Sequence, residues 1–167
     1  LNANSVHNKA QNMRSILDNL SFIMEDMSRN LRTGYSYHCL VTGDSLPVAS
    51  VSAPKNCASG WGIGFEYVNG NPSNNDDQWV YYIDGNGTIQ KAVMGPYTDQ
   101  TNFTQLTPNE VKLASVSGFY VFGAGALPGD KQQPFIKIIL AGSVTEKNVV
   151  SNFSLQTIVS SRRIDTF

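Results

Sequence analysis

The sequence predicts an α+β fold in which a long N-terminal amphipathic helix packs on an antiparallel β-sheet. Apolar residues in the first 33 positions recur at steps of three and four, which is the period of one helix face. After Gly34 the chain changes to short runs of aromatic and β-branched residues, with no second strong helical segment. We therefore expect a single domain over 1–167, with the helix over 1–33 and a connector and sheet over 34–167.

Composition narrows the functional classes. Charged residues make up 15% of the 167 residues and the net charge is −1, so no strong field attracts nucleic acid or anionic lipid. Neutral polar residues must cover much of the surface, a composition more typical of extracytoplasmic proteins. No run reaches the roughly 20 apolar residues of a membrane-spanning helix. We predict an extracytoplasmic protein with no specific nucleic-acid partner.

One apolar stripe runs along the whole predicted helix. Its members alternate steps of four and three: Val6, Ala10, Met13, Leu17, Leu20, Met24, Met27 and Leu31. Ile16, Phe22 and Ile23 widen the stripe in its middle, which favours packing on a sheet over a two-stranded coiled coil. Gly34 is the expected end of the helix.

The predicted helix is longer than a small domain is wide. From about Asn2 to Arg32 it would run roughly 45 Å, against a domain diameter of ~30 Å, so we expect one end to protrude. An ordinary long core helix is one explanation. The other is that the domain packs on the C-terminal half while the N-terminal half serves assembly. Because the chain opens on Leu1 without a convincing helix cap, we expect the helix to continue upstream.

Six segments after the helix have strand character. They are 61–68, 78–84, 88–94, 119–122, 135–141 and 153–160. Loops rich in Gly, Pro, Asn and Asp separate them, and no strand–helix–strand alternation is present. These features predict antiparallel pairing in one meandering sheet.

The run DGNGTI at 84–89 matches the middle of a calcium-binding EF-hand loop. Such a loop needs an acidic ligand two residues before Asp84 and a Glu nine residues after it, but these positions hold Tyr82 and Val93. A tight hairpin turn explains the same residues, so we favour the turn. Asp76 and Asp77 in the preceding loop could lie near a cation, but nothing in the sequence specifies a ligand cage.

Cys39 and Cys57 are the only cysteines, and with two histidines in the chain they lack the spacing of a zinc site. A Cys–His nucleophile is disfavoured because His38 and Cys39 adjoin in a strand-like segment, where successive side chains point to opposite faces. We predict a Cys39–Cys57 disulfide and an oxidising compartment, with two buried thiols as the alternative. We predict no catalytic, cofactor-binding or metal-binding residues and no enzymatic activity.

Several runs resemble bacterial type IV pilin-like proteins. They are the helix NLSFIMEDMSRNLRTG, the connector YSYHCL, the run LTPNEVKLASVSGFYVFG and the closing run FSLQTIVSSRRID. The likeness is greatest to minor pilins and pseudopilins with a prepilin-type N-terminal cleavage and methylation segment. It implies a pilin-like fold whose first helix continues upstream into an apolar membrane-spanning half that this chain lacks.

The resemblance implies a structural subunit of a type IV pilus or a type II secretion-like filament. Its partners would be other pilin or pseudopilin subunits, with the inner membrane as anchor before assembly at the cell surface. Both cysteines follow soon after the helix, which favours a minor or pseudopilin-like subunit over a major pilin. The helix packing and assembly residues would be Val6, Ala10, Met13, Leu17, Leu20, Met24 and Met27, the last three on the sheet and the first three at the neck. The alternative function is a secreted or surface-anchored binding module such as an adhesin.

Overall fold

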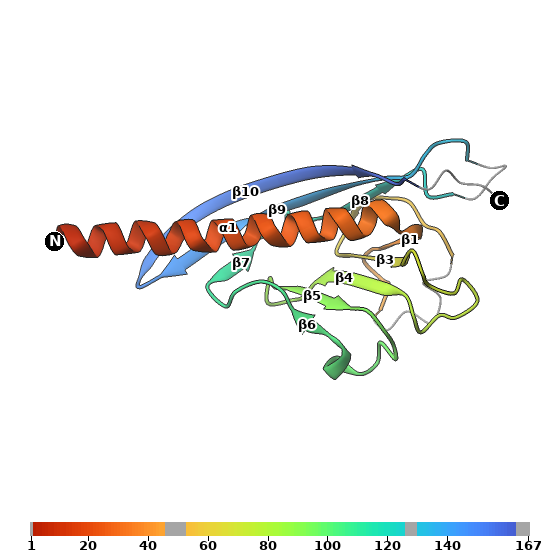
Figure 1. The fold of residues 1–167 in the computed structure, drawn as a ribbon, viewed down its shortest axis with the longest axis horizontal. Coiled ribbons are helices and arrows are strands. Elements are labelled where there is room, and N and C mark those ends of the chain that lie inside the picture. Colours follow the sequence, from red (N-terminus) through yellow and green to blue (C-terminus); the bar gives the residue numbers. More distant parts are fainter. Residues whose placement is uncertain (1, 46–52, 126–129, 163–167) are drawn as a thin grey trace.

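The computed structural model describes residues 2–45, 53–125 and 130–162. Within these residues, one long helix accompanies ten strands that form two antiparallel sheets (Figure 1). In chain order the elements are α1 (Ala3–Thr33), β1 (Tyr35–Leu40), β2 (Cys57–Gly60), β3 (Gly62–Glu66), β4 (Trp79–Ile83), β5 (Ile89–Ala92), the 3₁₀ turn η1 (Gln100–Asn102), β6 (Thr104–Gln105), β7 (Val111–Leu113), β8 (Gly118–Phe122), β9 (Phe135–Glu146) and β10 (Val149–Ser160).

Hydrogen bonds from residues next to the helix define both ends of α1. The side chain of Asn2 accepts a hydrogen bond from the Asn4 amide at 3.3 Å, which caps the start of the helix, so the expectation that this start has no cap is wrong. At the other end the Gly34 amide donates to the carbonyls of Asn30 and Leu31. Gly34 has an extended backbone that any residue can adopt, so glycine is needed at this position for lack of space rather than for its conformation. A Cβ there would collide with the ring of Phe65.

The first sheet has the strand order β1-β3-β4-β5-β6. A tight turn joins β4 to β5, with the Gly87 amide donating to the Asp84 carbonyl at 3.0 Å. The Asp84 carboxylate accepts from the amides of Asn86 and Thr88, and its second oxygen accepts from the Thr88 hydroxyl at 2.6 Å. Gly87 has φ +73°, a value that favours glycine. The residues that resemble an EF-hand therefore form a hairpin turn.

The second sheet has the order β10-β9-β8-β2, and β7 pairs with β9 beyond the end of β8. β9 and β10 have twelve residues each and pair along their full length, from Glu146↔Val149 to Phe135↔Ser160. Lys147 and Asn148 join them, both with positive φ, as a two-residue hairpin turn requires. This hairpin runs alongside α1 for much of the helix length (Figure 1).

The main core lies between α1 and one face of each sheet. It includes α1 residues together with Phe65 and Tyr81 of the first sheet and Ile138 and Leu140 of the second. A smaller cluster covers the opposite face of the first sheet, where Tyr97 packs over that sheet. Its other members are Leu40, Val80 and Ala92, with Trp61, Tyr82 and Phe103 packed against them.

The predicted fold class, a helix on one antiparallel sheet as in pilins, is wrong. The chain is mostly β, and its strands divide into two five-stranded sheets. β1 pairs with β3 in the first sheet, whereas β2, which lies between them in the chain, pairs with β8 in the second sheet. The chain then returns to the first sheet for β3 to β6 and ends in the second sheet with β7 to β10. Strand twist accumulates across a wide sheet, so one ten-stranded sheet would turn part of its apolar face away from the helix. Two smaller sheets can both bury their apolar faces against α1. Residues 163–165 of the closing run lie outside the described residues.

Candidate assembly surface on the helix

The C-terminal half of α1 (16–33) buries its apolar stripe against both sheets. Leu20 and Met27 have no exposed surface, and Met24 is 7% exposed. The helix contacts β9 and β10 of the second sheet, and its side chains belong to the same core as Tyr81 of the first sheet. Buried apolar side chains of this size each contribute about 1.5–3 kcal/mol to folding. This half is therefore an integral part of the domain.

Polar contacts bind the same half to the first sheet. Asn30 donates to the Tyr81 hydroxyl at 2.9 Å, and Lys91 Nζ lies 3.3 Å from Asp26. Burial raises the pKa of Tyr81, so its hydroxyl stays protonated at physiological pH. Tyr37 donates its hydroxyl hydrogen bond to the α1 terminus, with the carbonyl oxygens of Leu31 and Gly34 both within 2.6 Å. Sequence reasoning missed Tyr81 and Lys91 because they lie on strands far along the chain, whereas Tyr37 lies on β1, which directly follows the helix.

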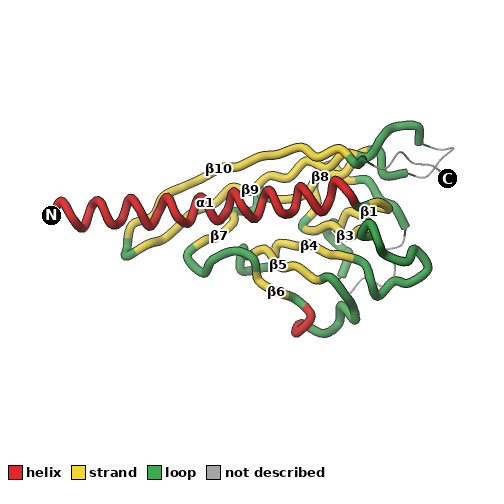
Figure 2. The backbone as a smooth tube through the Cα atoms, viewed as in Figure 1, coloured by secondary structure: helices red, strands yellow, loops and turns green. Residues whose placement is uncertain are grey.

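The N-terminal half of α1 (3–15) carries the same stripe with little cover. Val6 is 53% exposed and Ala10 is exposed, whereas Met13 is partly buried at the edge of the core. Asn12 donates to Glu146 at 3.3 Å, beside the β9–β10 turn. Figure 2 shows the first turns of the helix extending past that turn. Leu17, just after this half, is partly buried against the core.

The outer face of α1 is polar apart from one aromatic side chain. Phe22, expected to widen the packing face, is instead 72% exposed. Glu25 and Arg29, both exposed, lie on this side of the helix with 3.9 Å between their charged groups. The helix therefore presents two uncovered apolar features, Phe22 and the N-terminal stripe.

The predicted disulfide is confirmed. Cys39 of β1 bonds Cys57 of β2, with 5.9 Å between their Cα atoms, so the bridge joins the two sheets. Gly60 lies directly beside it, and a Cβ at this position would collide with the sulfur of Cys39. A structural disulfide indicates an oxidising, extracytoplasmic compartment. In the described part of the chain, α1 falls short of the apolar length needed to cross a membrane.

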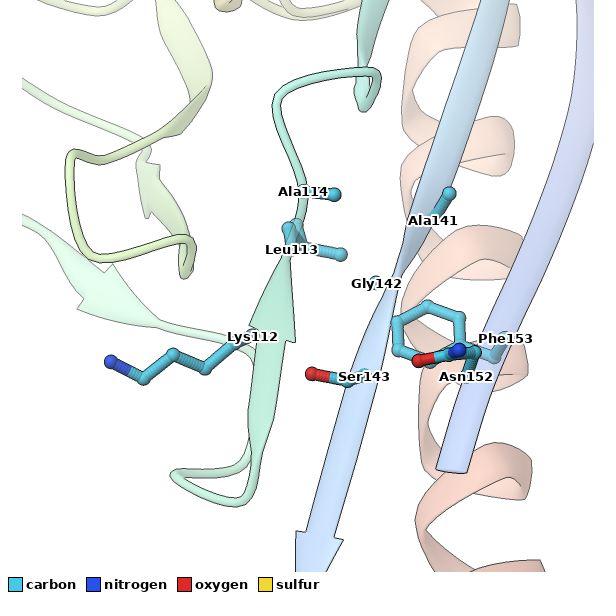
Figure 3. A pocket seen from close by; sticks show the side chains of 8 residues that line it. All are labelled: Lys112, Leu113, Ala114, Ala141, Gly142, Ser143, Asn152 and Phe153. Atoms are coloured by element: carbon cyan, nitrogen blue, oxygen red, sulfur yellow. The ribbon is translucent and has the colours of Figure 1, made fainter. Parts of the chain in front are cut away.

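The remaining polar groups give no catalytic arrangement among the described residues. His38 is 7% exposed, and its Nδ1 lies 2.5 Å from the carbonyl oxygen of Ala53. An open depression of 460 Å³ is lined by residues 112–114 at the end of β7, 141–143 of β9 and 152–153 of β10 (Figure 3). Its polar side chains include Ser143 and Asn152, while Lys112 points away from it. The lining holds no carboxylate or imidazole that could transfer a proton.

Comparison with protein-family models, curated proteins and solved structures gives no match. Of the seven predicted packing and assembly residues, Leu20, Met24 and Met27 are buried, Met13 and Leu17 are partly buried, and Val6 and Ala10 are exposed.

Proposed function

We propose that the chain is a structural subunit of a type IV pilus or type II secretion-like filament, a minor pilin or pseudopilin that assembles through its N-terminal helix. The observation that carries the proposal is the uncovered stripe on the N-terminal half of α1. In the C-terminal half the same stripe is buried by the chain's own sheets. In the N-terminal half Val6 and Ala10 lack such cover among the described residues.

An amphipathic helix surface of this kind is suited to pack on another helix. Apolar residues at steps of three and four form ridges that fit the grooves of a neighbouring helix. Val6, Ala10 and Met13 would supply these ridges, and small Ala10 would permit close approach of the two backbones. Other subunits of the same filament are the proposed neighbours.

Two further features support the proposal. The Cys39–Cys57 disulfide indicates an extracytoplasmic compartment, in which such filaments assemble. Its position soon after the helix, between the two sheets, favours a minor or pseudopilin-like subunit. On this proposal the coding sequence upstream of Leu1 specifies a short basic leader and then an apolar run that anchors the subunit in the inner membrane. An ordinary secretory leader in its place would contradict the proposal.

Cysteine cross-linking in cells tests the assembly surface directly. Val6→Cys, introduced into the full-length protein with its native disulfide intact, should give cross-linked dimers, because one added thiol per subunit forms one intermolecular disulfide. Asn8→Cys is the matched control, because Asn8 is also exposed and lies about 200° around the helix from Val6. Dimers from Val6→Cys alone support assembly through the stripe. Dimers in equal yield from both variants, or none from either, would contradict it and favour a secreted binding module.

A further inference from the structure

Three buried side-chain oxygens near the loop between β3 and β4 have no hydrogen-bond partner among the described residues. They are Glu66 Oε2, Asp77 Oδ1 and Gln78 Oε1. Glu66 is 2% exposed and Gln78 is fully buried. Buried polar atoms in folded proteins almost always have a partner, so three unpartnered oxygens in one region need an explanation.

The backbone brings these groups together. Glu66 ends β3 and Gln78 directly precedes β4, and the adjacent pair Phe65↔Trp79 belongs to the β3–β4 ladder. Gln78 Nε2 donates to Glu66 Oε1 at 2.6 Å, which directs the amide oxygen of Gln78 away from that carboxylate atom.

Asp77 and Glu66 meet at the same turn of the loop. Asp77 Oδ2 accepts from the Asn71 amide at 2.8 Å. Glu66 Oε2 lies against the preceding residue, Gly70, 2.8 Å from the position that a Cβ would occupy. The two carboxylates therefore approach neighbouring residues of one turn, and the glycine at 70 leaves room for the Glu66 oxygen.

The region concentrates negative charge. Asp76 adds a third carboxylate, and Tyr97, which donates to the Gln78 carbonyl at 2.6 Å, lies among all three. Burial raises the pKa of Tyr97, and the charges of Asp76, Glu66 and Asp77 raise it further. The ion pairs of the described residues join other carboxylates, namely those of Glu25, Asp44 and Asp26. No basic side chain offsets this charge in the described part of the chain.

We propose that this loop binds a Ca²⁺ ion through Glu66 Oε2, Asp77 Oδ1 and Gln78 Oε1, with backbone carbonyls and water completing the coordination. Ca²⁺ accepts mixed carboxylate and amide oxygens in flexible geometry, whereas Mg²⁺ requires a near-ideal octahedron. A proton on Glu66 is the simpler alternative, but it supplies one hydrogen bond and satisfies only one other oxygen. A cation satisfies all three at once. Two of the three ligands, Glu66 and Gln78, were missed by sequence reasoning because they lie at strand ends on either side of the loop.

Thermal unfolding of the protein tests the site. After treatment with EDTA, addition of CaCl₂ at about a hundredfold excess over Kd should raise the Tm by roughly 5–10 °C. MgCl₂ should raise it less. Asp77→Asn keeps the side-chain shape but removes a ligand charge, so it should lose most of the Ca²⁺ response. Asp18→Asn is the matched control, because it makes the same charge change at an exposed position of α1 and should keep the full response.

Terbium luminescence provides a second measurement that does not depend on the stability of a variant. Trp79 and Tyr67 stack with 4.3 Å between ring centroids, and both adjoin the ligand residues, so they can sensitise Tb³⁺ bound in the loop. Ca²⁺ should displace the Tb³⁺ and remove the emission. Absence of a Ca²⁺ effect in both measurements, or an equal Ca²⁺ response from Asp77→Asn and Asp18→Asn, would overturn the proposal.

The pH dependence of stability distinguishes a Ca²⁺ ion bound in the loop from a proton on the Glu66 carboxyl. Burial, with a smaller contribution from the charge of Asp77, raises the pKa of Glu66 above its ordinary value of 4.5. The folded protein without Ca²⁺ therefore holds the proton more tightly than the unfolded chain, and this contribution to stability is lost as pH rises from 4.5 through the folded pKa. Ca²⁺ should abolish the loss, and Glu66→Gln should abolish it without Ca²⁺. The same pH dependence with and without saturating Ca²⁺ would contradict the site.

Discussion

The two halves of α1 have the same apolar period but opposite surroundings. In the C-terminal half, Leu20 and Met27 have no exposed surface, whereas Val6 in the N-terminal half is 53% exposed. The C-terminal half is also hydrogen-bonded to both Tyr37 and Tyr81, while Asn12 makes one exposed hydrogen bond to the second sheet. A helical period therefore identifies which face is apolar, but not what covers that face.

The end of the β9–β10 hairpin accounts for the difference. Its turn at Lys147 and Asn148 follows Glu146, which contacts Asn12. Beyond that level the helix continues without a strand beside it (Figure 1). The length of the hairpin therefore determines where the domain stops covering α1, and mutations on the two sides of this level should have unequal effects.

The largest expected effect is that of Leu20→Ala. Removing a fully buried leucine side chain leaves a cavity and should lower the free energy of unfolding by about 2–5 kcal/mol. Val6→Ala, the matched change in the other half, should lower it by less than about 0.5 kcal/mol. Urea denaturation followed by circular dichroism measures both. Similar losses for the two variants would show that the N-terminal half is covered in solution.

Removal of the disulfide should have the next largest effect. Cys39 and Cys57 are 18 residues apart, and chain-entropy arguments give about 3 kcal/mol for closing a loop of that length. The double variant Cys39→Ser/Cys57→Ser should be destabilised by that amount in denaturant titrations. Because the bridge joins the two sheets that hold the C-terminal half, amide exchange should accelerate there and stay unchanged before Asn12. Acceleration confined to the N-terminal half would contradict this account.

A smaller effect is expected from Tyr81→Phe, which leaves the Asn30 side chain without its 2.9 Å acceptor. Loss of this partly buried hydrogen bond should destabilise the protein by about 1 kcal/mol. Tyr82→Phe is the control, since the Tyr82 hydroxyl makes a longer, exposed contact of 3.4 Å with Gln100. Equal denaturation midpoints for both variants would show that the Asn30–Tyr81 hydrogen bond does not help to hold α1 on the first sheet.

The smallest effect is expected from Asn12→Ala. Its hydrogen bond to Glu146 is exposed, so the loss should be a few tenths of a kcal/mol. Hydrogen exchange is the more sensitive measurement, because the amides of the first turns should exchange faster once the last contact with the hairpin is gone. A loss comparable to that of Tyr81→Phe would mean that the hairpin tip anchors the helix as firmly as the first sheet does.

The candidate sites differ in how far they could be predicted. The disulfide could be inferred because the chain has only two cysteines and no zinc spacing. The exposure of Phe22 could not, because its position beside the stripe is compatible with either face until the sheets are placed. Of the Glu66–Asp77–Gln78 cluster, the sequence pointed only to Asp77. Glu66 and Gln78 lie at the ends of β3 and β4 on either side of an irregular loop, and no sequence spacing predicts that the loop brings them together.

The sequence by itself determined the helix period, its end near Gly34 and the hairpin turn after Asp84, because each depends on local geometry. It also determined the cysteine pair, because the chain has only two cysteines and they lack the spacing of a zinc site. Only the tertiary structure decided that the strands form two sheets. The β2–β8 and β7–β9 pairings join segments far apart in the chain, and β2, β6 and β7 are too short to have a readable alternation. Which strands meet depends on the burial of whole faces around α1, a long-range balance that no single segment encodes.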